Sequence, residues 1–246
     1  MSALSLPWLL LLLCPIWTYP ACPRLAADET VRVERVVDGD TLKLKDGRTI
    51  RLIGIDTPEL NPYDRTQAEP GATHARDWLR NNFKKGSQLK LVFGVKKHDD
   101  YGRWLAHPLW PSGAPLTEQM LLLGLGSLLL IAPNHELWPC LFAAETKARR
   151  ARRGIWSRPL SMLPSQTGWQ MLRGRVTAVS TESNRVRLLL EDKVWLQAGS
   201  RSSPELRLRL AQIRPGTLLF VRGWVYRDKG EWRLWLNRPW QYSKEN

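Results

Sequence analysis

The chain has 246 residues, of which 43% are hydrophobic and 24% are charged, and its formal net charge is +14. This apolar content excludes a chain that is disordered throughout, and the length suits one large domain or two small ones. The strong positive charge favours a polyanionic partner such as nucleic acid, an anionic membrane surface or an acidic polysaccharide, although basic surfaces also serve solubility alone.

The first 27 residues are typical of a signal peptide. An apolar run covers residues 9–13, and Ala26 and Ala27 offer a small-residue cleavage site before Asp28. The run is too short to span a bilayer comfortably, so we expect export to the periplasm or the medium with no stable membrane span after cleavage. No Lys or Arg precedes the run, and two other interpretations stay open: a buried N-terminal helix, and lipid attachment at Cys22.

The cysteines are Cys14, Cys22 and Cys140. Cleavage after Ala27 would leave Cys140 alone, within the apolar residues 137–142. A single cysteine cannot form an internal disulfide, so we expect Cys140 to pack in the core.

The next part of the chain alternates strand and helix patterns. Apolar and charged residues alternate in five segments that predict strands: 31–37, 41–45, 48–55, 88–95 and 103–110. Helical spacing or an apolar run ending at glycine predicts three helices: 68–83, 116–123 and 136–153. The predicted fold class is therefore mainly β with helices (α+β): a five-stranded OB-type barrel with about three helices.

Residues 159–167 are rich in Pro and Ser and predict a linker between a domain at 28–158 and a smaller β-rich domain at 168–246, for which we consider an OB-like fold. Tryptophan occupies both faces of its last predicted strand, at Trp232 and Trp235. With the nearby arginines, these rings suit a stacking platform for single-stranded nucleic acid. A tryptophan-rich core with a solvated basic face, or polysaccharide binding, explains the pattern equally. The arginines concerned are Arg222, Arg227 and Arg233.

Acidic and basic residues gather at three predicted strand ends: residues 38–41, 51–59 and 99–103. Because Thr57 precedes Pro58, the chain must turn there and present its carboxylates at the end of a strand. Neighbouring carboxylates repel unless a cation lies between them, and hard oxygen ligands suit calcium. Forked arginine donors in the same clusters match the oxygens of a phosphate. Each cluster alone is also an ordinary turn or helix start.

Taken in order, these motifs resemble the staphylococcal nuclease (thermonuclease) family. The resemblance covers about half of the chain. It rests on Val37-Asp38-Gly39-Asp40-Thr41-Leu42-Lys43-Leu44, Arg51-Leu52-Ile53-Gly54-Ile55-Asp56-Thr57-Pro58-Glu59, Tyr101-Gly102-Arg103 and Gly154-Ile155-Trp156-Ser157.

The resemblance implies a calcium site and a hydrolytic mechanism. Asp40 and Asp56 match carboxylates that bind the ion, and Thr57 matches a position whose backbone carbonyl also binds it. Glu59 matches the proposed general base that activates the attacking water. The implied reaction is in-line hydrolysis at phosphorus, which breaks the bond to the 5′ oxygen and leaves a 3′-phosphate.

The resemblance also assigns the groups that hold the phosphate. Arg51 and Arg103 match the arginine pair that stabilises its extra charge, and Tyr101 matches a tyrosine near the phosphate. Two features depart from the family: Asp100 replaces a basic residue, and residues 128–131 are aliphatic where relatives place tyrosines that stack on the base. Base stacking is worth about 1–3 kcal/mol, so its loss would weaken nucleotide affinity. Trp104 and Trp110 are possible substitutes, with core packing as the alternative.

The sequence therefore predicts a monomeric, exported, calcium-dependent nuclease acting on DNA and/or RNA. The alternative is a non-catalytic protein that binds nucleic acid or another polyanion on the same fold. An inactive relative is expected to lack an arginine, the glutamate or a calcium aspartate of this set. All of them are present here, which favours catalysis: Asp40, Arg51, Asp56, Glu59 and Arg103.

Overall fold

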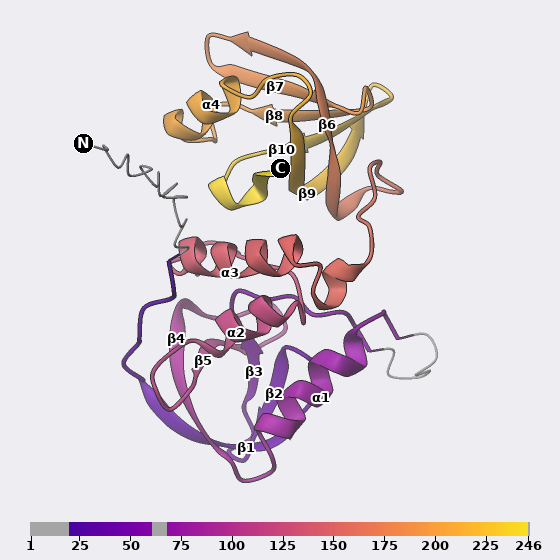
Figure 1. The fold of residues 1–246 in the computed structure, drawn as a ribbon. Helices are drawn as coiled ribbons and strands as arrows, with labels where there is room; N and C mark the ends of the chain where they lie inside the picture. The colour runs from indigo at the N-terminus through magenta and orange to yellow at the C-terminus, as the bar shows by residue number, and fades with distance from the viewer. Residues whose placement is uncertain (1–19, 61–67, 246) are drawn as a thin grey trace, which may run out of the picture.

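The structure is a computed structural model that describes residues 20–60 and 68–245. Two β-barrels lie one above the other, and helix α3 (Trp138–Arg150) lies between them (Figure 1). The predicted signal segment falls mostly outside the described residues. Within them, no helix is long and apolar enough to cross a membrane.

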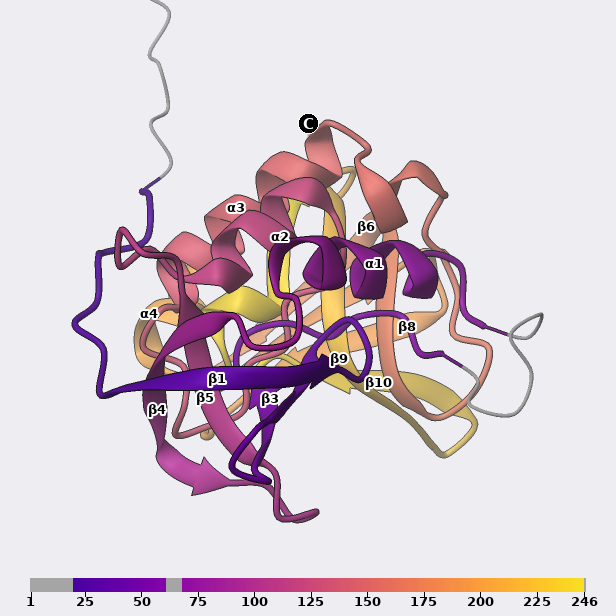
Figure 2. The ribbon, with the colours of Figure 1, turned by 90° about the horizontal axis from the view of Figure 1, so that it is seen from below.

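The first barrel is closed in the order β1-β2-β3-β5-β4, which confirms the predicted five-stranded OB-type barrel. Strands β3 and β5 pair in parallel, and the other neighbours pair antiparallel. Strand β1 lies on the side of this barrel that faces away from the second barrel (Figures 1 and 2). The strands are β1 (Glu29–Val36), β2 (Thr41–Leu44), β3 (Thr49–Leu52), β4 (Gln88–His98) and β5 (Trp104–Leu109).

The alternating strand pattern places the apolar side chains inside this barrel. Val33, Leu42, Ile50 and Leu91 are completely buried, and helices α1 and α2 contribute Leu79 and Met120 to the same core. Strand β3 ends earlier than predicted because Gly54 adopts a left-handed conformation, with φ of 89°. The helices are α1 (Ala72–Asn82), α2 (Leu116–Leu123) and α3, with a 3₁₀ turn at Gly154–Ser157.

The C-terminal strands form a second barrel with the same pairing order as the first. Strand β10 pairs in parallel with β8 and antiparallel with β9, which closes the ring β6-β7-β8-β10-β9. Helix α4 follows the third strand, as α1 does in the first barrel, so this region has the OB-type topology that we considered. The elements are β6 (Gly168–Glu182), β7 (Arg185–Leu190), β8 (Val194–Ala198), α4 (Pro204–Ala211), β9 (Leu218–Asp228), β10 (Glu231–Trp235), a 3₁₀ turn at Pro239–Gln241 and β11 (Tyr242–Glu245).

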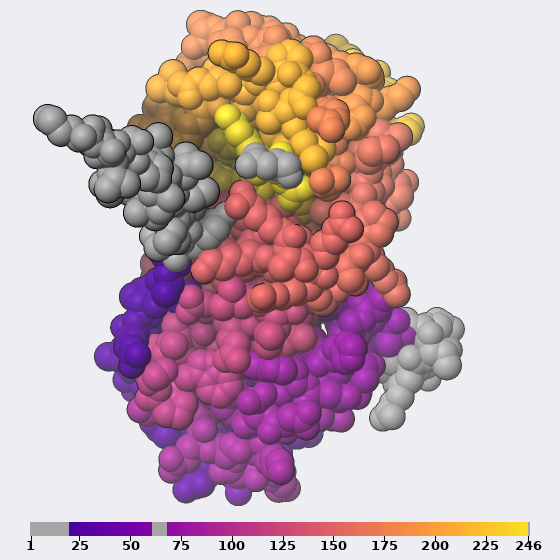
Figure 3. Space-filling model, viewed as in Figure 1, coloured from indigo at the N-terminus to yellow at the C-terminus, as the bar shows by residue number. Residues whose placement is uncertain are grey.

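The second barrel packs closely on helix α3. Trp240 joins the hydrophobic core of the first barrel, with its ring 5.8 Å from that of Trp138. Phe220 of β9 is fully buried against Ala148 and Trp156. Figure 3 shows the two barrels in continuous contact through the belt that carries the colour of α3. The barrels are thus joined by an apolar interface as well as by the chain between them.

Of the interpretations open for the tryptophans of the last strand, the structure favours core packing for Trp232. Trp232 packs against the core of the second barrel, beside the fully buried Leu234. Arg222, which we had placed at the platform, is only 1% exposed and faces α3, because the outward face of β9 covers that helix. The most exposed tryptophans of the described residues are Trp169 and Trp224, which lie opposite each other on β6 and β9.

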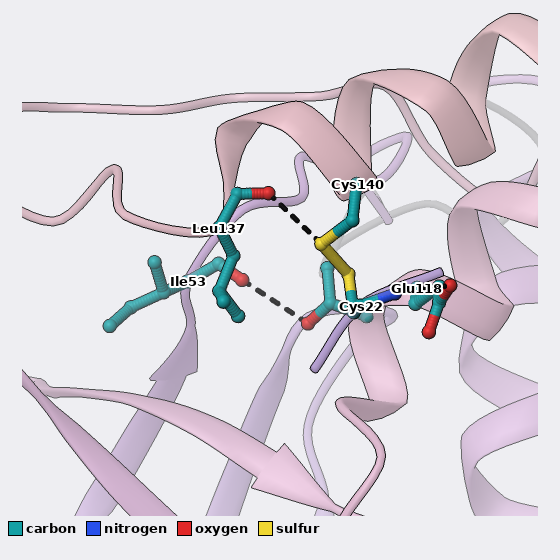
Figure 4. Close-up of a disulfide and its surroundings, with 6 residues drawn as sticks. Cys22, Ile53, Glu118, Leu137 and Cys140 are labelled. Carbon is teal, nitrogen blue, oxygen red and sulfur yellow. Dashed lines mark hydrogen bonds between the residues drawn. A yellow bond between two sulfur atoms is a disulfide. The ribbon is translucent and has the colours of Figure 1, made fainter. Parts of the chain in front are cut away.

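Cys22 and Cys140 form a disulfide, so the expectation of an unpaired Cys140 is wrong (Figure 4). The segment before β1 is held beside α2 and α3 by further contacts: the Cys22 N–H donates to Glu118 Oε1 at 3.0 Å, and the Leu25 N–H donates to the Gly113 carbonyl at 2.9 Å. The pairing joins positions 118 residues apart, which only the tertiary fold brings together. Cleavage after Ala27 would remove this bond from the mature chain.

His107 makes the stability of the first barrel depend on pH. The ring lies in β5, is 5% exposed, and its Nδ1 finds no partner among the described residues. Burial lowers its pKa from 6.5 to about 4. As the pH falls below 6.5, the unfolded chain binds a proton at this histidine before the folded chain does. The free energy of unfolding is therefore highest above pH 6.5 and decreases toward pH 4, by on the order of 3 kcal/mol. The test is urea unfolding of His107→Leu, with His74→Leu at an exposed position as the control. The free energy of unfolding should depend less on pH than in the wild type for His107→Leu only. Equal pH dependence in both would contradict it.

Candidate active site

A glycine brings the loop between β1 and β2 against the turn after β3. A Cβ on Gly39 would lie 2.5 Å from Thr57 Oγ1, so only glycine allows this approach. Asp40, 3% exposed, accepts hydrogen bonds at Oδ2 from the Thr57 N–H at 3.1 Å and the Thr57 hydroxyl at 3.2 Å. Asp38 Oδ1 accepts the Asp40 N–H at 3.0 Å. Two motifs that are separate in the sequence thus form one unit.

Asp56 is fixed by a backbone bridge to a segment that the sequence analysis did not identify. Its N–H donates to the Ser127 carbonyl at 2.8 Å, and the Ser127 N–H donates to the Asp56 carbonyl at 2.8 Å. A Cβ on Gly126 would lie 2.5 Å from that Asp56 carbonyl oxygen. The only hint in the sequence was the small Gly126-Ser127 pair within a run of leucines.

Arg51 lies between the two aspartates. Its Nη1 is 3.0 Å from Asp40 Oδ2, and its Nη2 is 2.9 Å from Asp56 Oδ1. Nη1 also donates to the Ile55 carbonyl at 2.7 Å. One cationic group therefore bridges both carboxylates, which shows that their oxygens converge on a position suited to positive charge.

The two carboxylates at this position are of the donor type that calcium prefers. The guanidinium of Arg51 stands in for a cation between Asp40 and Asp56, and the backbone of Thr57 adjoins both. Carboxylate and carbonyl oxygens, completed by water, are the ligands that calcium prefers. In the part of the chain that the structure describes, no three His, Cys, Asp or Glu side chains gather into a metal site.

Carboxylates crowd around this position and perturb each other. Partial burial, followed by the charges of Asp40, Asp38 and Asp56, raises the pKa of Glu59, while Arg51 opposes this effect. Burial also raises the pKa of Asp56, although Arg51 again opposes it. These carboxylates are therefore partly buried and close enough to repel one another, and a bound cation would offset that repulsion.

Burial and the Asp40 charge raise the pKa of Asp38 in the same way.

Glu69, which the sequence analysis passed over, contacts the site from the segment just before α1. Its Oε2 accepts the Glu59 N–H at 3.0 Å, and its own N–H donates to the Glu59 carbonyl at 2.9 Å. Glu69 therefore anchors the backbone of Glu59.

Arg103 is oriented by Asp99, a second residue that the analysis did not single out. The Arg103 Nε donates to Asp99 Oδ2 at 2.7 Å, and its backbone N–H donates to Asp99 Oδ1 at 2.9 Å. Arg103 does not contact the aspartate pair, but its charge acts to lower the pKa of Asp56, so it lies within electrostatic reach. Its guanidinium is 5.6 Å from the centre of the Tyr101 ring, which is 87% exposed.

Neither proposed substitute for the family tyrosines is free to stack on a base. Trp104 packs against Phe93 and His98, with ring centres 5.3 and 4.3 Å apart. Trp110 packs against Trp78 and Phe83. Both rings serve the packing of the barrel, which was the alternative interpretation.

The chain is similar to known nucleases across the first barrel. The family model described as Staphylococcal nuclease homologue matches residues 49–158. The thermonuclease of Staphylococcus hyicus is 31% identical over 135 residues, which cover 54% of this chain and 78% of that protein. An uncharacterized endonuclease of Escherichia coli O157:H7 is 30% identical over 139 residues, 55% of this chain and 82% of that protein.

A third similarity extends into the second barrel. Endonuclease YhcR of Bacillus subtilis is 27% identical over 205 residues, which cover 74% of this chain but only 17% of that much longer protein. These relatives support a nuclease function. The closed barrel, the converging aspartates and arginine, and the match to most of a thermonuclease show that the chain belongs to the staphylococcal nuclease family.

Proposed function

We propose that this protein is an exported, calcium-dependent nuclease that hydrolyses the phosphodiester bonds of DNA or RNA. The observation that carries the proposal is the convergence of Asp40 and Asp56 on one cationic position, with Thr57 beside it. Family membership supports nuclease chemistry, and the net charge of +14 suits a nucleic acid substrate.

Each polar residue of the site has a role in this reaction. Asp40, Asp56 and the Thr57 carbonyl would hold a calcium ion, which would supply positive charge to offset that on the phosphate. Glu59 accepts a proton from the attacking water. Arg51, released from Asp40 and Asp56 where a cation replaces it, would join Arg103 in donating forked hydrogen bonds to the phosphate oxygens, where negative charge grows as the water attacks.

The substrate is held mainly through its phosphates. Residues 128–131 are aliphatic; Leu128 and Leu130 are buried, and Ile131 is 67% exposed. A flat aromatic surface for the base is therefore missing from this segment, and the affinity for a mononucleotide is correspondingly low.

The disulfide supports export to an oxidising compartment. Cys22–Cys140 would persist in the periplasm or outside the cell. Retention of this bond requires that the leader be cleaved before Cys22, rather than after Ala27.

Calcium removal tests the proposed chemistry. The full exported chain should degrade plasmid DNA, single-stranded DNA or RNA with calcium and stop when calcium is chelated, because the carboxylate pair then lacks its ion. Glu59→Gln is the matched control, since it should still bind calcium but cut at a small fraction of the wild-type rate. Cleavage undiminished by chelator would overturn the metal assignment, and tight nucleic acid binding without cleavage would favour the non-catalytic alternative.

A further inference from the structure

A buried ion pair connects the second barrel to helix α3. Arg222 of β9 donates from Nη1 to Glu145 Oε1 at 2.9 Å and from Nη2 to Glu145 Oε2. Arg222 is 1% exposed and Glu145 is completely buried. The pair therefore lies wholly inside the interface between the barrels, where Figure 1 places α3.

The pair also holds both backbone polar groups of one residue in the first barrel, Leu128. Arg222 Nη1 donates to the Leu128 carbonyl at 2.7 Å, and Glu145 Oε1 accepts the Leu128 N–H at 2.7 Å. Leu128 directly follows Ser127, the residue whose backbone exchanges two hydrogen bonds with Asp56. Arg222 of the second barrel is thus connected to one of the two site aspartates by hydrogen bonds at Leu128 and at Ser127, which are neighbours in the chain.

Stability alone is a weak explanation for this arrangement. A buried ion pair loses much of its Coulombic gain to desolvation, and apolar side chains of similar size often replace one without loss of stability. What an apolar pair cannot supply is a donor for the Leu128 carbonyl and an acceptor for the Leu128 N–H. Such outer hydrogen bonds commonly orient the groups that bind a metal.

We propose that Arg222 is a positioning residue of the nuclease site: together with Glu145 it fixes residues 127–128 and so sets the position of the Asp56 carboxylate. This inference rests on the proposed function. It makes the second barrel part of the active site's construction, so that the barrel does more than add affinity for nucleic acid.

Three variants of the full chain separate positioning from stability. Arg222→Met removes the donor and leaves Glu145 with Arg149 alone, whose Nε lies 3.8 Å from Glu145 Oε2. The double variant Arg222→Met with Glu145→Met removes both charges and leaves an apolar pair. Arg222→Lys keeps a charge beside Glu145 but loses the fork that reaches both Glu145 and Leu128.

The measurements are calcium binding by calorimetry, thermal unfolding and the rate of DNA cleavage. All three variants should bind calcium about 10- to 100-fold more weakly than wild type, with a matching loss of rate. The double variant should recover thermal stability relative to Arg222→Met without recovering calcium affinity. Glu245→Gln is the control, because it removes the ion pair between β11 and Arg149 of α3 but leaves Leu128 untouched.

Each outcome decides the proposal. Wild-type calcium affinity in the folded Arg222→Met chain, or recovery of both stability and affinity in the double variant, would overturn the positioning role. If Arg222→Met does not fold, the double and Arg222→Lys variants carry the same test. A wild-type chain that neither binds calcium nor cuts nucleic acid would overturn the proposed function instead, and the positioning role with it.

Discussion

Arg51→Lys is expected to lower kcat about a hundred- to a thousandfold while the barrel stays folded. In the structure the Arg51 fork reaches Asp40, Asp56 and the Ile55 carbonyl at once. Lysine keeps the charge but offers a single nitrogen, so it cannot span two carboxylates or two phosphate oxygens with the same geometry. The loss should therefore appear in turnover rather than in folding.

The measurement is the steady-state rate on a short oligonucleotide at saturating calcium, with circular dichroism to verify the fold. Arg48→Lys provides the matched control, since Arg48 also makes a forked pair with two carboxylates, Glu29 and Asp46, at the β2–β3 turn. Its rate should stay close to that of wild type. A folded Arg51→Lys enzyme with near-normal kcat would remove Arg51 from the catalytic site.

Replacing Cys22 and Cys140 together by alanine is expected to lower the free energy of unfolding by about 2–5 kcal/mol. The disulfide closes a loop of 118 residues and fastens the segment before β1 to the start of α3. Without it the unfolded chain gains conformational entropy. The folded chain also loses the restraint that keeps Cys22 and Leu25 in contact with the α2 region.

Urea unfolding of the exported protein measures this loss, and reduction of the wild type with a thiol should reproduce it. The intact mass of the exported wild type should be two hydrogens below that of the reduced chain, as one disulfide requires. Its N-terminus should lie at or before Cys22. A mature chain that begins after Cys22, or equal stability of the oxidised wild type and the double variant, would contradict the expectation.

The sequence by itself determined the first barrel and the identity of its polar groups. Alternation of apolar and charged residues through 31–55 and 88–110 requires one buried face, and a period of two can be read without knowledge of the partner strand. The turn at Thr57-Pro58 likewise follows from local sterics. Local rules and the motif order were enough to name Asp40, Arg51, Asp56, Thr57, Glu59, Tyr101 and Arg103 as candidates.

The tertiary structure alone decided what fixes those groups in place. Nothing local pairs Ser127 with Asp56, Cys22 with Cys140, or Arg222 with Glu145, because each contact joins segments 71 to 118 residues apart. The interpretation that placed Arg222 beside a nucleic acid platform does not hold for this residue. Alternation tells which face of a strand points outward from its own barrel, but not whether a second domain covers that face. The buried charge of Arg222 is compensated by Glu145, which only the tertiary fold brings beside it.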